Sequence, residues 1–203
     1  MPEAPELTPE HFEILVVREL RKIGLEVSAL QVHRRATLPE PERGYLLELR
    51  GRVSRGSWQR RVLIACRRQG TPTGRGQVES FRAHLDEAGA EAGILFSNTD
   101  FDQDAVTAAA GRSVALLRVA DGRTAFDTSG WGTPGHYPAW LPAYCAQAVD
   151  RDVFGQVRYR LLESGQGESD LIMSQLGSQK QEARDGPAGA AEGRDGRAPG
   201  VGG

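Results

Sequence analysis

Long apolar runs, cysteines and lysines are all scarce in this chain of 203 residues. No window approaches the roughly 18 consecutive apolar residues of a membrane-spanning helix, and the first ten residues are acidic, unlike a signal peptide. We therefore expect no membrane contact and a cytoplasmic location. Two cysteines cannot form a disulfide framework, and the four histidines show no metal-binding spacing, so we expect no structural zinc and assign no metal ligand.

Aromatic residues are also few, at 6%, whereas glycine is abundant, with 25 residues. This composition is typical of a folded domain with a glycine-rich appendage. We predict a folded domain over residues 1–123, a C-terminal extension rich in tryptophan and proline over residues 124–163, and a disordered tail over residues 164–203. Because apolar residues are sparse in the tail, it should not bury enough surface to offset the entropy of ordering, and it should be dispensable.

The net charge is only −2, which argues against a protein that coats nucleic acid generally. The charge is unevenly distributed, however. From His33 to Arg75 the chain has eleven arginines against three glutamates, so this segment carries +8 and the remainder −10. Because the guanidinium group suits phosphate, we predict a phosphate-binding surface, with a merely solvated basic face as the alternative. Its predicted DNA-binding residues are Arg34, Arg35, Arg50, Arg52, Arg60, Arg61, Arg68 and Arg75.

The first part of the chain predicts one helix and three strands. Residues 7–23 have helical spacing of apolar side chains, and Thr8 followed by proline suits the start of a helix. The expected elements after it are a short strand over Leu25–Val32, a loop over Arg34–Arg43, and two strands, Gly44–Val53 and Arg60–Arg68, joined as a hairpin.

The middle of the chain predicts alternating helices and strands. The expected elements are a helix that ends before Gly89, a buried strand over Ala92–Ser97, a helix that begins at Thr99 or Asp100, and a buried strand over Val114–Val119. This order favours an α/β fold with a partly parallel sheet. Beyond Asp121 the signals weaken, and we expect a loop over Gly130–Pro142 and one helix within residues 143–162.

Several local strings occur in the order in which one known family has them. They are His11-Phe12-Glu13 with Gly24-Leu25-Glu26-Val27, then Val62-Leu63-Ile64-Ala65-Cys66-Arg67-Arg68, then Gly76-Gln77-Val78, and finally Ala92 to Asn98. The stretch from about Thr8 to Val119 resembles the nuclease domain of the Mrr-type restriction endonucleases, which act in type IV restriction and belong to the PD-(D/E)xK superfamily. The resemblance implies an α/β restriction-endonuclease-like core, a mixed central sheet flanked by helices.

The resemblance also implies a magnesium-dependent endodeoxyribonuclease. In that family an aspartate on the second strand, and a glutamate or glutamine with a lysine two residues later on the third, gather at a magnesium ion and a water that attacks the DNA phosphodiester. Residues i and i+2 of a strand share a face, so both side chains reach one phosphate. The cation polarises the phosphate, and the lysine stabilises the negative charge of the transition state.

The chain departs from this pattern at each of these positions. Leu46 aligns with the aspartate, Ala65 with the glutamine or glutamate, and Arg67 with the lysine. Leucine and alanine offer no oxygen to a metal. Arginine can contact phosphate, but it does not exchange a proton at ordinary pH.

Three glutamates remain as candidates for migrated metal ligands: Glu13 on the first helix, Glu42 in the loop and Glu48 on the second strand. Glu48 shares the strand face of Leu46, but a plain ion pair with an arginine of that face is the favoured interpretation. The favoured interpretation is a helix-face carboxylate near the domain edge for Glu13, and a solvated loop charge for Glu42. We take Glu13, Glu48 and Arg67 as the catalytic candidates. Cys66 points to the opposite strand face, so we expect a buried core residue there.

These substitutions favour a catalytically degenerate, DNA-binding domain that acts in DNA restriction, defence or repair without a cofactor. The alternative is an active endonuclease that uses Mg²⁺ through migrated ligands, and a weaker alternative is a protein-interaction scaffold. The expected partner is DNA, contacted through its phosphates without sequence preference. A second copy of the chain or a partner subunit is a further candidate.

Overall fold

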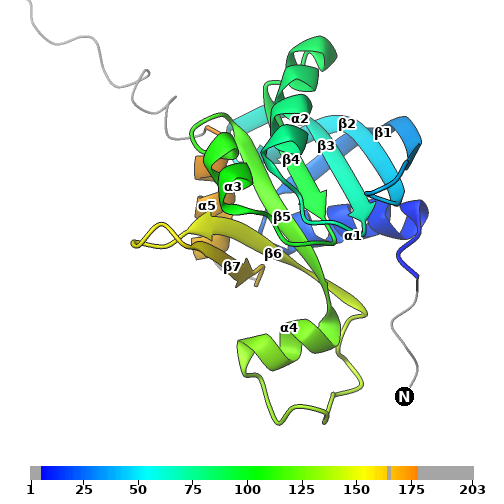
Figure 1. The fold of residues 1–203 in the computed structure, drawn as a ribbon. Helices are drawn as coiled ribbons and strands as arrows, with labels where there is room; N and C mark the ends of the chain where they lie inside the picture. The colour runs from blue at the N-terminus through cyan, green and yellow to red at the C-terminus, as the bar shows by residue number, and fades with distance from the viewer. Residues whose placement is uncertain (1–5, 164–165, 178–203) are drawn as a thin grey trace, which may run out of the picture.

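The computed structural model describes residues 6–163 and 166–177. Its centre is a mixed sheet of seven strands, which lie side by side in sequence order (Figure 1). They are β1 Glu26–Leu38, β2 Gly44–Arg55, β3 Trp58–Gln69, β4 Ala92–Ser97, β5 Val114–Asp121, β6 Tyr144–Arg151 and β7 Val157–Leu161. Strands β3, β4 and β5 are parallel, and the other neighbours are antiparallel. This arrangement confirms the predicted α/β class with a mixed central sheet.

Helices cover both faces of the sheet (Figure 1). Within the described residues they are α1 Pro9–Lys22, α2 Arg75–Ala88, α3 Gln103–Ala109, α4 Gly122–Ser129 and α5 Gln166–Gln175. One hydrophobic core contains the buried side chains of α1 and α5, and a second contains those of α2 and α3. None of the helices in the described part of the chain is long and apolar enough to cross a membrane.

The alternation of side chains along β3 divides them between the two cores. Ile64 and Cys66 belong to the core on the α1 side, whereas Leu63 and Ala65 belong to the core on the α2 side. Complete burial, with a smaller contribution from Glu13, raises the pKa of the Cys66 thiol well above its ordinary value. Cys66 therefore stays protonated and serves as a core residue, as its strand position indicates.

Two glycines determine where α2 ends and how closely this helix packs on the sheet. Gly89 ends the helix with a φ of 62°, a left-handed conformation that glycine adopts without a steric penalty. Gly93 lies on β4 beneath the helix, and a Cβ atom at this position would be 2.7 Å from the ring of Phe81. The missing side chain therefore allows α2 to approach the sheet and cover the face that carries Ala65.

The structure corrects the predictions for the segment between α1 and β2. The strand expected over Leu25–Val32 extends to Leu38, and so the loop expected over Arg34–Arg43 is reduced to residues 39–43. The physical reason is pairing, because β1 follows β2 as far as the partners Leu38 and Gly44. The ladder is irregular between Val32 and Arg34, where residue 33 is an extra residue of a β-bulge.

The structure also corrects the C-terminal predictions. The helix expected within residues 143–162 is wrong, because β6 pairs with β5 and β7 pairs with β6. The disordered tail expected from residue 164 is wrong for its first part, because α5 and the residue after it bury Ile172, Met173 and Leu176 in the same core as α1. The rest of the predicted tail, residues 178–203, lies outside the described residues.

Candidate functional site

A small cleft lies between the β2–β3 hairpin and α2, on the face that corresponds to the predicted catalytic face. Leu46 is paired with Arg67 across the hairpin, and Glu48 is paired with Ala65. All four side chains line the cleft. The structure therefore brings together the positions expected from the sequence, because residues two apart on each strand project to one side.

Of the three substituted family positions, Leu46 and Ala65 are apolar, and Arg67 is a permanent cation. Leu46 is 9% exposed and Ala65 is 2% exposed, and both pack in the core beneath α2. The Nε of Arg67 donates a hydrogen bond of 2.7 Å to Gln69, and its guanidinium lies 3.8 Å from the Glu42 carboxylate. Burial lowers the pKa of Arg67, and the two glutamates nearby, Glu42 and Glu48, act in the opposite direction.

Glu13 does not reach this cleft. It lies on α1, whose buried side packs in the core on the other face of the sheet, and it borders a hollow along the outer side of that helix. Glu42 is closer, but it is engaged with Arg67 and receives a 3.5 Å contact from the amide of Gln77. The predicted catalytic set Glu13, Glu48 and Arg67 is thus not assembled in one place.

Glu48 is the carboxylate that the structure places in the cleft. It is 4% exposed, and its Oε2 atom has no hydrogen-bond partner among the described residues. The Nε2 of His84 on α2 lies 3.6 Å from that oxygen, and the Nδ1 of the same ring lies 3.3 Å from Glu87. His33 on β1 completes a group whose potential ligand atoms are all within 4.8 Å of one another.

The sequence analysis missed both histidines, because the four histidines of the chain show no metal-binding spacing. The sequence does contain a signal for part of the group, since His84 and Glu87 are three residues apart and share a helix face. It contains none for His33, whose orientation depends on the bulge in β1.

The predicted DNA-binding arginines do not form one surface. Arg35 faces α1 and pairs with Glu10, and Arg68 is paired across the hairpin with Tyr45, whose side chain packs against the core on the α1 side. By contrast, Arg50, Arg52 and Arg61 border a hollow near the end of α2. The remaining members of the set are Arg34, which lines the cleft, Arg60, and Arg75, which pairs with Glu79 at the start of α2.

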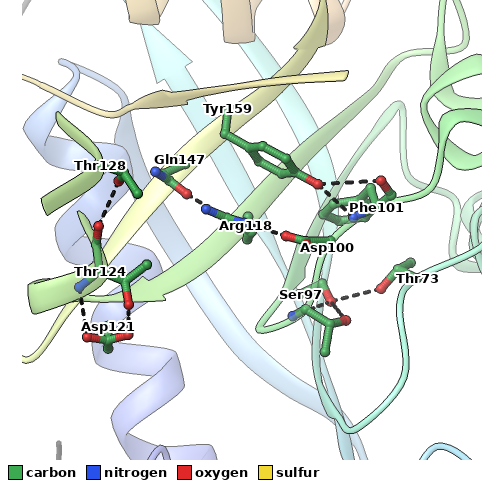
Figure 2. Close-up of polar contacts among 11 residues, drawn as sticks. Thr73, Ser97, Asp100, Phe101, Arg118, Asp121, Thr124, Thr128, Gln147 and Tyr159 are labelled. Atoms are coloured by element: carbon green, nitrogen blue, oxygen red, sulfur yellow. Dashed lines mark hydrogen bonds and ion pairs between the residues drawn. The ribbon is translucent and has the colours of Figure 1, made fainter. Parts of the chain in front are cut away.

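A second polar cluster lies at the carboxyl ends of the parallel strands, where Figure 2 shows its contacts. The hydroxyl groups of Thr73 and Ser97 are 2.8 Å apart. Arg118 donates to Gln147 at 2.8 Å, pairs with Asp100, and stacks 4.0 Å from the centre of the Tyr159 ring. Because these polar groups already satisfy one another, the cluster joins β4, β5, β6 and β7 rather than offering free ligands.

Asp121 in the same region begins α4. Its carboxylate accepts a hydrogen bond from the backbone N–H of Arg123. It also accepts from the backbone N–H and the hydroxyl of Thr124 (Figure 2). Burial would raise the pKa of Asp121, but these hydrogen bonds outweigh it and hold the pKa below its ordinary value. The residue is an N-cap, and its role is structural.

The fold and the position of the cleft define a restriction-endonuclease-like domain, with a mixed sheet, helices on both faces, and the site on the second and third strands. The restriction endonuclease family Mrr_cat matches residues 4–123, which is more than half of the chain. The chain therefore belongs to the Mrr_cat restriction endonuclease family. No curated protein and no solved structure matches it.

The residues of the cleft do not fit the magnesium ion that this family implies. Mg²⁺ requires oxygen ligands in a near-octahedral arrangement. Leu46 and Ala65 supply none, Arg67 places a positive charge beside them, and Glu48 is the only carboxylate among the described residues that line the cleft. Its close neighbours are imidazole nitrogens, which magnesium does not favour.

Proposed function

We propose that this chain is a DNA-binding member of its family that has lost magnesium-dependent cleavage, and that it acts in DNA restriction, defence or repair. The observation that carries the proposal is the composition of the cleft. Across paired positions of β2 and β3, the residues are leucine, alanine and arginine, where the family chemistry needs two oxygen donors and a lysine. Phosphate contact survives these changes, since arginine binds phosphate oxygens well.

The arginines around α2 are the proposed phosphate contacts. Arg34 and Arg52 are exposed, and neither makes an ion pair with another described residue. Arg50 and Arg61 lie beside Arg52, and Arg67 lies in the cleft itself. This side of the hairpin carries the local excess of positive charge. Because the arginines named here all lie on strands β1, β2 and β3, the proposed binding is to the DNA backbone without sequence preference.

Paired arginine substitutions test this surface directly. We expect Arg34→Gln and Arg52→Gln each to weaken binding of a fluorescent duplex about tenfold, because one charge-assisted hydrogen bond contributes about 1.5 kcal/mol. Arg21→Gln is the matched control, since Arg21 is an exposed arginine on the outer side of α1. The proposal fails if the control weakens binding as much as the other two, or if the unmodified chain does not bind at low salt.

The rival, an endonuclease with migrated magnesium ligands, takes them from Glu13, Glu42 or Glu48. Glu13 borders a hollow along α1 and Glu42 pairs with Arg67, so this rival depends on Glu48, the carboxylate that lines the cleft. Nicking of supercoiled plasmid with magnesium distinguishes the two. Activity in the unmodified chain that is lost in a folded Glu48→Ala variant would support the rival.

A further inference from the structure

The cluster of His33, Glu48 and His84 has the composition of a transition-metal site rather than a magnesium site. It offers two imidazole nitrogens and one carboxylate oxygen, each from a different element: β1, β2 and α2. Imidazole suits zinc, copper, iron and nickel, and three protein ligands with one open position is the usual arrangement of a catalytic zinc ion. Within the described residues, no other group of this kind is present.

An unsatisfied buried oxygen indicates where the ion would be. Glu48 Oε2 lies in the cleft with its side chain 6% exposed, and it has no hydrogen-bond partner among the described residues. A buried carboxylate oxygen without a partner is costly, so such an atom needs a compensating charge. His84 Nε2 is 3.6 Å away, beyond hydrogen-bond distance. On a tetrahedral ion with bonds of about 2.1 Å, two ligand atoms are about 3.4 Å apart.

The surroundings of His84 also fit a metal ligand. Its Nδ1 lies 3.3 Å from the carboxylate of Glu87, one turn further along α2. A carboxylate on the outer nitrogen favours the tautomer that carries its proton there, which leaves the lone pair of Nε2 directed at Glu48. This carboxylate–histidine arrangement orients the ring and makes it a stronger ligand for a cation.

The bulge in β1 explains the position of the second histidine. Because residue 33 is inserted between the partners Val32–Leu49 and Arg34–Glu48, His33 and Arg34 both lie near Glu48 instead of alternating between the two faces. His33 is exposed, whereas Glu48 is buried and His84 is intermediate. The cluster therefore has a buried carboxylate at its base and an opening to solvent through which an ion can enter.

Arg50 is the group that opposes the ion. Its guanidinium donates to His33 Nε2 at 2.8 Å, and so it competes for the nitrogen and adds positive charge. Arg34 and Arg67 also line the cleft. Against these cations stand the carboxylates of Glu48 and Glu87. A metal bound through His33 Nε2 displaces Arg50, and the positive charge of this arginine lowers the affinity for a cation in either case.

We infer that His33, Glu48 and His84 bind a divalent transition-metal cation of the zinc class, with its open position toward Arg34 and Arg67. The inference concerns metal binding in the free protein and does not depend on DNA binding. It goes beyond the family chemistry, since none of the three residues stands at the family's metal-binding positions, which Leu46 and Ala65 occupy.

Cobalt(II) is the probe, because it substitutes for zinc and its absorption reports nitrogen and oxygen coordination. We expect the full chain, without an affinity tag, to bind one cobalt ion, which excess zinc displaces and excess magnesium does not. His33→Ala, His84→Ala and Glu48→Gln should each weaken binding at least about tenfold, since even outer-shell changes cost about 10- to 100-fold. Arg50→Gln should strengthen it.

The two remaining histidines provide matched controls, because His11 lies on α1 and His136 lies in the segment between α4 and β6. Cobalt affinity should be unchanged in His11→Ala and in His136→Ala. Glu48→Gln preserves the side-chain shape, and so it tests the site even where an alanine variant does not fold. Absence of stoichiometric cobalt binding would overturn the inference, as would equal losses in the controls, or binding that Glu48→Gln leaves unchanged.

Discussion

At the scale of single residues, three side chains carry the proposed loss of magnesium-dependent cleavage. Leu46, Ala65 and Arg67 occupy adjacent positions of the β2–β3 hairpin, and two of them are packed into the core beneath α2. That these side chains share one strand face could be predicted from the sequence, because strand alternation is a local property. The convergence of His33 and His84 on Glu48 could not, because it depends on a bulge and on the packing of a distant helix.

Reversion of these residues tests whether they account for the predicted loss of cleavage. We expect Leu46→Asp, Ala65→Glu and Arg67→Lys, each alone, to leave magnesium-dependent nicking of supercoiled plasmid at background, because such groups act as a unit. Only the triple variant should nick detectably. Since Ala65 is 2% exposed, the melting temperature of each variant must be measured alongside. A single reversion that nicks plasmid would show that one missing group was limiting.

At the scale of elements, the sequence predicted best where the apolar pattern and the final pairing agree. The hairpin and the buried strand β4 are examples, because both carry apolar runs bounded by turn residues. The third helix was expected to begin at Thr99 or Asp100, whereas α3 begins after Asp102, whose carboxylate accepts from the N–H of Ala105 at 2.6 Å. Several polar residues in succession suit an N-cap, and only the packed backbone selects one.

The C-terminal elements were missed for a different reason. β6 contains the alanine-rich run from Cys145 to Val149, and alanine favours a helix in isolation. Pairing with β5 and β7 overrides that preference. The helix α5 has few apolar residues, but the structure buries two of them, Ile172 and Met173, together with Leu176 directly after the helix. This short apolar cluster packs against the core on the α1 side, and the sequence around it gives no sign of that contact.

A pair of truncations tests the contribution of α5. A chain that ends at Glu163 loses the buried Ile172, Met173 and Leu176, as well as the ion pair of 2.8 Å between Arg55 and Asp170. We expect its melting temperature to fall by roughly 10 °C or more, because each buried apolar side chain contributes about 1.5–3 kcal/mol and 1 kcal/mol shifts the midpoint about 2–4 °C. The matched control ends at Gly177 and should melt within a few degrees of the full chain. Equal stability of the two truncated chains would contradict this role for α5.

At the scale of the whole molecule, positive and negative charges are concentrated in different segments of the chain, and their sum is small. The net charge is −2, yet residues 33–75 alone carry +8, and the arginines of this segment that border α2 lie on one side of the sheet. The proposed DNA-binding surface is thus a local positive field on a molecule whose other segments are acidic in sum. Affinity should therefore arise from a few phosphate contacts and should be strongly screened by salt.

Salt titration measures the number of those contacts. With four or five phosphates neutralised, the dissociation constant for a duplex should rise about 10²- to 10³-fold between about 50 mM and about 200 mM salt, because bound counterions are released on binding. Two duplexes of unrelated sequence should give the same slope and the same affinity, since the contacts are to the backbone. Arg52→Gln should reduce the slope by about one unit, whereas Arg21→Gln should leave it unchanged. A binding constant that is insensitive to salt would refute the backbone-binding surface, because phosphate contacts release counterions. A preference for one of the two sequences would also refute it, because it would show that the protein reads bases.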